Sequence, residues 1–163
     1  MEPEVGELLV GAYLKMIVGC QFIDYNVRVP GGGQDGLREL DVVGFDFNSK
    51  TAYLCEVTTH ILGALYGSGT EETIERIIKK HEFQRSYAGL HLTDFPTLQF
   101  QFWSPYVPVG KITKALEGVP SLELVINQNY TARVNELRAK AREVSYDAGN
   151  SVFRTLQILE HLR

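Results

Sequence analysis

Residues 38–58 carry the sequence RELDVVGFDFNSKTAYLCEVT, and this stretch decides the fold. Two runs rich in β-branched and aromatic residues, 38–47 and 51–58, stand on either side of Asn48-Ser49. Such runs around a short polar turn predict a β-hairpin. With a two-residue loop at 48–49, positions that sum to 97 lie opposite each other.

This register places Asp41 opposite Glu56. Because side chains alternate along a strand, Glu39 and Asp41 share one face of the predicted hairpin, and Glu56 and Thr58 share one face. Like charges directly opposite are destabilising unless a cation neutralises them, and carboxylate oxygens suit Mg²⁺. The pattern therefore predicts a metal site, with the alternative that these acids only solubilise an open sheet edge.

The rest of the chain predicts one α/β domain. Helical spacing of apolar residues predicts a first helix over 4–18 that ends at Gly19, and a second over 70–89 with Ser68 or Thr70 as its cap. Further segments follow: strands at 20–29, 97–104 and 121–126, and helices at 111–117, 130–145 and 150–162. The order gives an α-β-β-β-α-β core over about 4–126, a mixed sheet flanked by helices, and a C-terminal helical extension.

Gly31, Gly33 and Gly36 satisfy the dinucleotide-binding pattern G-x-G-x-x-G. That fingerprint must open a helix, whose N-terminus receives the pyrophosphate. A strand follows here, so we interpret the glycines as a flexible loop between two strands.

Composition narrows the class of protein. The chain has 163 residues, of which 44% are hydrophobic and 22% charged, as in ordinary globular domains. No apolar run approaches the roughly 20 residues of a membrane helix, and we expect a cytoplasmic protein that does not enter a membrane. Cys20 and Cys55 stand alone in separate strands, which predicts buried reduced thiols.

Several short motifs together resemble the PD-(D/E)XK nuclease superfamily, especially Holliday-junction-resolvase-like and small bacterial endonuclease-like members. They are Gly6-Glu7, Tyr13-Leu14, Gly19, Ile23, Asn26-Val27-Arg28, Glu39-Leu40-Asp41-Val42-Val43 and Glu56-Val57-Thr58. The resemblance covers about residues 4–90 and implies a restriction-endonuclease-like fold.

The resemblance also implies roles for individual residues. Asp41 matches the metal-binding Asp, Glu56 the Glu of the (D/E)XK motif, and Glu7 the first-helix Glu of the resolvase-like branch; Mg²⁺ or Mn²⁺ is the implied cofactor. Thr58 departs from the family, whose lysine at this position orients water and stabilises developing negative charge. An ordinary solvated glutamate remains the alternative for Glu7.

Some superfamily members take the missing lysine from the following helix. A helical projection of 70–89 places Lys80, Gln84 and Tyr87 on one flank of the core-facing stripe, whereas Lys79 points outward. We therefore predict that Lys80 substitutes for a lysine at position 58. Gln84 and Tyr87 also resemble the Gln and Tyr that exonuclease-type members carry on this helix, which implies that Gln84 joins the site. A solvated helix flank remains the alternative for all three.

The net charge of −4 gives no global attraction to nucleic acid, so any DNA contact must be local. Arg76, Lys80 and Arg85 are the candidates. The leading hypothesis is a Mg²⁺-dependent DNA phosphodiesterase. Its rival is an inactive nuclease-fold module for DNA binding or protein assembly, favoured by Thr58 and by C-terminal amphipathic helices suited to a partner or to a homodimer.

Overall fold

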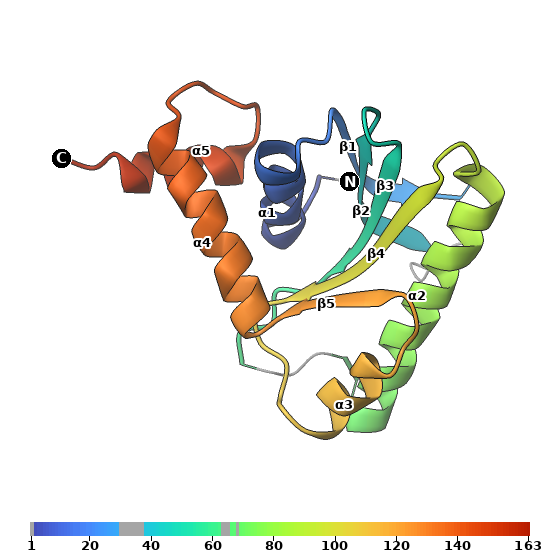
Figure 1. Ribbon diagram of the computed structural model, residues 1–163. Helices are drawn as coiled ribbons and strands as arrows, with labels where there is room; N and C mark the ends of the chain where they lie inside the picture. Colours follow the sequence, from blue (N-terminus) through green and yellow to red (C-terminus); the bar gives the residue numbers. More distant parts are fainter. Residues whose placement is uncertain (1, 30–37, 63–65, 68) are drawn as a thin grey trace.

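The structure is a computed structural model that describes residues 2–29, 38–62, 66–67 and 69–163. The elements follow the order α1, η1, β1, β2, β3, α2, β4, α3, β5, α4 and α5 (Figure 1). The predicted order of one helix, three strands, a helix and a strand is therefore confirmed. The glycine loop at 31–36 and the cap at Ser68 lie outside the described residues.

The first helix is in two parts. The α-helix α1 (Val5–Tyr13) continues directly into a π-helical turn, η1 (Leu14–Val18). Gly19 ends the helix with φ +91°, a left-handed conformation that glycine adopts without steric cost. The predicted helix over 4–18 is thus confirmed in extent.

Five strands form one mixed sheet in the order β1-β2-β3-β4-β5. Their bounds are β1 Phe22–Arg28, β2 Glu39–Asp46, β3 Thr51–Val57, β4 Thr97–Ser104 and β5 Leu122–Ile126. The first three strands are antiparallel neighbours, whereas β4 and β5 join in parallel. Parallel neighbours need a crossover, and helices α2 (Thr70–His91) and α3 (Lys111–Glu117) supply the two crossovers here.

Helices cover both faces of this sheet. Helices α2 and α3 lie on one side, and α1, α4 (Gln128–Glu143) and α5 (Ser151–Glu160) lie on the other (Figure 1). Successive side chains of β4 point to opposite faces of the sheet and pack against both helical layers. Phe102 packs with Ile77 of α2, and Trp103 packs with Leu137 of α4. None of the helices in the described ranges is both long and apolar enough to span a membrane.

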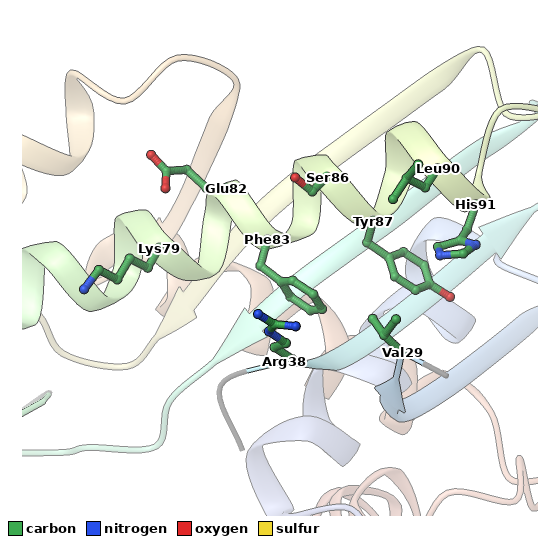
Figure 2. Close-up of a pocket in the computed structure, with 9 residues that line it drawn as sticks. All are labelled: Val29, Arg38, Lys79, Glu82, Phe83, Ser86, Tyr87, Leu90 and His91. Carbon is green, nitrogen blue, oxygen red and sulfur yellow. The ribbon is translucent and has the colours of Figure 1, made fainter. Parts of the chain in front are cut away.

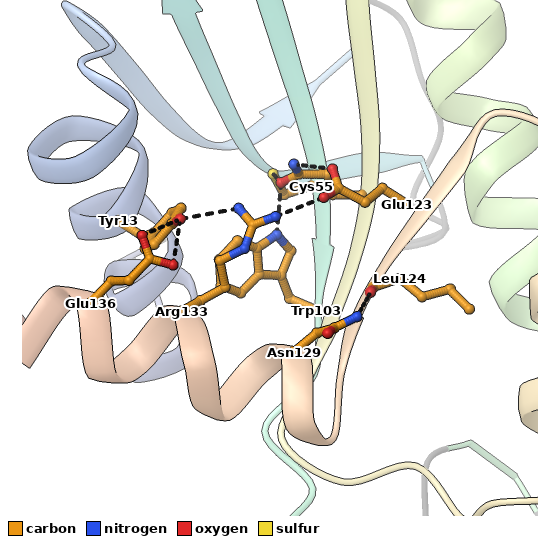
Figure 3. Close-up of polar contacts among 9 residues, drawn as sticks. Tyr13, Cys55, Trp103, Glu123, Leu124, Asn129, Arg133 and Glu136 are labelled. Carbon is orange, nitrogen blue, oxygen red and sulfur yellow. Dashed lines mark hydrogen bonds and ion pairs between the residues drawn. The ribbon is translucent and has the colours of Figure 1, made fainter.

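A cluster of polar contacts docks α4 on the sheet (Figure 3). Arg133 donates to Glu123 Oε1 at 2.7 Å and to the Tyr13 hydroxyl at 3.2 Å. Its guanidinium also lies 5.1 Å from the centre of the Tyr13 ring and 5.8 Å from that of Trp103. One side chain therefore links α1, α4, β4 and β5.

The hairpin register is the predicted one, since every pair from Val42–Cys55 to Asp46–Thr51 sums to 97. Two other details differ from the prediction. The strands stop at 46 and 51, so the loop between them has four residues instead of two. The N-cap of α2 is Gly69, with extended backbone and no side-chain cap. The two cysteines are buried and free, as predicted.

Candidate functional site

Asp41 and Glu56 lie where β2 and β3 part. Pairing of the two strands ends at Val42–Cys55, one residue before them. The Val57 amide then donates to Asp41 Oδ2 at 2.8 Å, so a carboxylate takes the place of a backbone carbonyl as the acceptor. Both acids are buried, with 9% of Asp41 and 5% of Glu56 exposed, which rules out the solubilising role at an open edge.

Two side chains from the α2 side of the sheet bind Glu56. Lys80 Nζ lies 3.2 Å from Glu56 Oε1, and the Tyr66 hydroxyl donates to the same oxygen at 3.1 Å. The Lys80 side chain is only 14% exposed. The predicted reach of Lys80 into the acidic face is therefore confirmed, while Lys79 is exposed, as the projection indicated.

Burial and mutual repulsion disfavour two negative charges here. Burial, followed by the charge of Asp41, raises the pKa of Glu56 to about 8, although Lys80 opposes the shift. Burial also raises the pKa of Asp41. Burial alone would lower the pKa of Lys80, but the carboxylates of Glu56 and Asp41 raise it. The two acids therefore titrate as a coupled pair that favours one shared proton at neutral pH, and the remaining negative charge faces the Lys80 ammonium.

Gln84 is one helical turn beyond Lys80 and is buried, with 2% exposed. Its Nε2 donates to the Leu54 carbonyl of β3 at 3.3 Å. Its Oε1 has no hydrogen-bond partner within the described part of the chain. Gln84 thus contacts the strand that carries Glu56 instead of the acids themselves, and it acts as a positioning residue that fixes α2 against β3.

Thr58 is buried beside β4. Its hydroxyl donates to Ser104 Oγ at 2.9 Å, and its amide donates to the Trp103 carbonyl. These contacts tie the end of β3 to β4. The hydroxyl carries no charge, so the positive charge in this site comes from Lys80.

Glu7 lies on α1 and makes its hydrogen bonds with residues other than the acidic pair. Its carboxylate accepts from Asn26 Nδ2 at 3.1 Å and from the Glu4 amide at 2.9 Å. Burial raises its pKa, with a smaller contribution from the charge of Asp41. Glu7 is buried rather than solvated, and its two bonds are to the N-cap residue of α1 and to β1.

The donor set suits a hard divalent ion with two protein ligands. Asp41 uses Oδ2 and Glu56 uses Oε1 in the contacts above, so each carboxyl group has a second oxygen that these contacts do not use. Mg²⁺ is commonly held by one or two carboxylates and completes its shell with water and phosphate oxygens. In the described ranges, no three His, Cys, Asp or Glu side chains are grouped closely enough to hold a metal ion.

The two predicted DNA-binding arginines lie on different flanks of α2. Arg76 is on the side of Lys80, over the Tyr66 ring at 5.7 Å and paired with Glu72 at 3.7 Å. Arg85 is exposed and lies five positions after Lys80, about 140° round the helix. Only Arg76 is therefore on the flank of the acidic pair.

Tyr66 is the site residue that the sequence analysis missed. It follows β3 in a loop, where no periodicity predicts the direction of a side chain. No known protein family matches the chain, nor does any curated protein or solved structure. The relation to the PD-(D/E)XK superfamily thus remains a prediction from the motifs.

Proposed function

We propose that the protein is a divalent-metal-dependent phosphodiesterase that cleaves DNA, of the PD-(D/E)XK type. The observation that carries the proposal is the buried Asp41–Glu56 pair with the Lys80 ammonium 3.2 Å from Glu56. Two acids and a cation buried at a strand end are costly for folding, and such arrangements concentrate at functional sites.

Each residue has a chemical task in this proposal. Asp41 and Glu56 would hold Mg²⁺ or Mn²⁺, which when bound polarises the phosphate and lowers the pKa of the attacking water. Lys80 stabilises the negative charge that grows on the phosphate in the transition state, replacing the lysine that Thr58 lacks. Tyr66 and Gln84 hold Glu56 and α2 in place for this contact.

DNA as the substrate is supported by local charge rather than by the whole chain, whose net charge is −4. Arg76 lies on the same flank of α2 as Lys80, one turn earlier, and Arg38 is exposed at the start of β2. Phosphate binding depends on such clustered cations. Arg85 is on the other flank and has no part in the proposal.

A second candidate is an inactive nuclease-fold module that binds DNA or assembles with protein. The ion pair of Lys80 with Glu56 favours it, because the ammonium already neutralises a carboxylate that would bind a metal ion. The neutral Thr58 favours it as well. In this role Asp41, Glu56 and Lys80 are the remnant of a catalytic site.

A nuclease assay separates the two. Supercoiled plasmid and labelled oligonucleotides would be incubated with purified protein in Mg²⁺ or Mn²⁺, with Asp41→Ala as the matched control. Cleavage by the wild type that Asp41→Ala abolishes is the expected result. Activity that survives in Asp41→Ala would indicate a contaminant. No cleavage by the wild type, combined with metal-dependent cleavage by Thr58→Lys, would establish the inactive module.

The same proposal places the protein in the cytoplasm and leaves a homodimer as a candidate assembly. Exposed apolar residues on and after α5 support the second point: Ile158 is 58% exposed, Leu159 57% and Leu162 71%. Light scattering coupled to size exclusion, with Leu159→Glu as the comparison, tests the assembly.

A further inference from the structure

A pocket of about 370 Å³ runs along α2, the helix that carries Lys80. Figure 2 shows α2 as one wall, with Arg38 and Val29 facing it from the sheet side. Lys79 stands at one end of the pocket, and the next residue along α2 is Lys80 of the candidate site. His91 marks the opposite end, at the C-terminus of α2.

One wall of the pocket is aromatic. Phe83, Tyr87 and His91 follow each other at intervals of four residues, and therefore share one side of α2. The ring centres of Phe83 and Tyr87 are 6.5 Å apart, and those of Tyr87 and His91 are 4.7 Å apart. Phe83 and Tyr87 are half-buried, so their rings are fixed by packing but still line the pocket.

Charge is concentrated on the other parts of the lining. Arg38 and Lys79 are exposed cations, Glu82 is the opposing anion, and the lining carries one net positive charge with His91 neutral. Arg38 directly precedes Glu39, whose carboxylate acts on both Asp41 and Lys80. Arg38 and Lys79 are therefore each followed in the sequence by a charged residue, Glu39 or Lys80, that interacts with the acidic pair.

We propose that this pocket binds an unpaired nucleotide of the DNA strand presented to Asp41 and Glu56. The base stacks on Phe83 and Tyr87, and Arg38 and Lys79 receive the phosphate. The inference rests on the proposed function for its substrate, and it adds a preference for DNA with a single-stranded segment.

The geometry favours an unpaired nucleotide over a base pair. Inside a duplex both faces of a base are stacked on its neighbours, so a ring on a helix surface reaches a base only when that base leaves the stack. Aromatic rings beside a cationic track are the common design of single-strand binding sites. The volume lies at the lower end of the range for small-ligand pockets, which suits one nucleotide.

Binding measured in EDTA tests the pocket without cleavage. Fluorescence anisotropy would compare a blunt duplex with the same duplex carrying a single-stranded overhang of about five nucleotides. Two variants alter the pocket: Tyr87→Leu removes a stacking face but keeps an apolar side chain, and Leu90→Glu adds a negative charge at a rim position that is 76% exposed. Gly89→Glu is the matched control, because an added side chain there meets no atom within 4 Å and the position is not on the pocket lining.

We expect the wild type to bind the overhang substrate about tenfold more tightly than the blunt duplex, as stacking of one base allows. Tyr87→Leu and Leu90→Glu should lose most of this preference, and Gly89→Glu should keep it. A wild type without the preference, or a preference that survives in both pocket variants, overturns the proposal. Equal loss in Gly89→Glu overturns it too, because a nonspecific charge effect would then be responsible.

Further experiments distinguish a free nucleotide from a DNA strand as the ligand, and distinguish failure of the pocket proposal from failure of the phosphodiesterase proposal. If deoxyadenosine monophosphate displaces the bound DNA at the same concentration as a single-stranded oligonucleotide does, the pocket is a site for free nucleotides. This result would overturn the assignment to a DNA strand. If the protein never cleaves DNA but shows the Tyr87-dependent preference, the pocket stands and the phosphodiesterase fails. If it cleaves without that preference, only the pocket fails.

Discussion

Lys80 of α2 and Glu56 of β3 form a largely buried ion pair, with Nζ 3.2 Å from Oε1 and side-chain exposures of 14% and 6%. The same carboxylate oxygen accepts from Tyr66, and the neighbouring Asp41 accepts from the Val57 amide. A helix, a loop and two strands thus converge on one pair of acids. The Lys80 ammonium thus brings a positive charge to a site whose strand motif ends in the neutral Thr58.

The first prediction concerns this lysine. If Lys80 stabilises the transition state, Lys80→Ala should lower the single-turnover rate of DNA cleavage by on the order of 10²-fold or more, as removal of such a group does. The rate should be measured at saturating DNA, so that weaker binding does not contribute.

Lys50→Ala is the control for this variant. Lys50 is exposed at the hairpin tip, at the opposite end of β2 and β3 from the acids, and its loss should change the rate by less than about threefold. Equal rates for wild type and Lys80→Ala would show that the lysine is not part of the chemistry.

The second prediction concerns metal binding. A ligand that binds only the folded protein stabilises it by about 2.7 kcal/mol at 100 times its Kd, which for a chain of this size is roughly 5 to 10 °C in Tm. Mg²⁺ or Mn²⁺ should therefore raise the Tm of the wild type, and Asp41→Asn should lose the response. NaCl at matched ionic strength controls for screening. The same shift in both proteins would place the ion elsewhere.

The third prediction follows from the pKa of Glu56, which is raised from 4.5 to about 8. Between these two pH values the folded protein holds a proton that the unfolded chain has released. The free energy of unfolding should therefore fall as pH rises through this window, by on the order of a few kcal/mol, and change little from this group above it.

Glu56→Gln removes the group and should flatten this dependence, leaving the smaller effect of Asp41, whose pKa is also raised. Urea unfolding in EDTA at pH 5.5 and pH 8 measures the difference. Parallel pH dependences in wild type and Glu56→Gln would contradict the raised pKa.

The hairpin and the lysine could be predicted because each depends on one local period. Alternation along 38–58 and a short turn fix which residues face each other, and Asp41 and Glu56 follow directly after Val42–Cys55, the last pair of this register. The repeat of α2 similarly places Lys80 beside the core-facing stripe. Both patterns carry their geometry in the sequence itself.

The remaining contacts depend on tertiary packing. Thr58 meets Ser104 because β3 and β4 are parallel, and the α2 crossover sets that register. Gln84 was expected on a flank of α2 but is buried, because the helix packs on the Leu54 carbonyl. Glu7 is buried and accepts a hydrogen bond from Asn26 of β1. The backbone of Asn26 is left-handed, with φ +52°, and a strand pattern in the sequence does not predict this conformation.

The last prediction concerns the opposite face of the sheet, where Arg133 joins Tyr13, Glu123 and Trp103 (Figure 3). Trp103 pairs with Val57, whose amide binds Asp41, so this cluster supports the strands that carry the acids. Arg133→Met keeps much of the apolar contact but removes the charge and leaves Glu123 without this partner. We expect a loss of about 1 to 3 kcal/mol in the free energy of unfolding.

Arg142→Met is the control, because Arg142 is 69% exposed and its partner Glu160, whose side chain is 8% exposed, keeps the ion pair with Arg138; loss of one such exposed charge should cost about 1 kcal/mol or less. Urea denaturation would compare the two variants at the same pH. The m-values should stay equal to that of the wild type, since neither change alters the surface exposed on unfolding. If Arg142→Met costs as much as Arg133→Met, the cluster contributes no more than a surface ion pair, and another contact must hold α4 on the sheet.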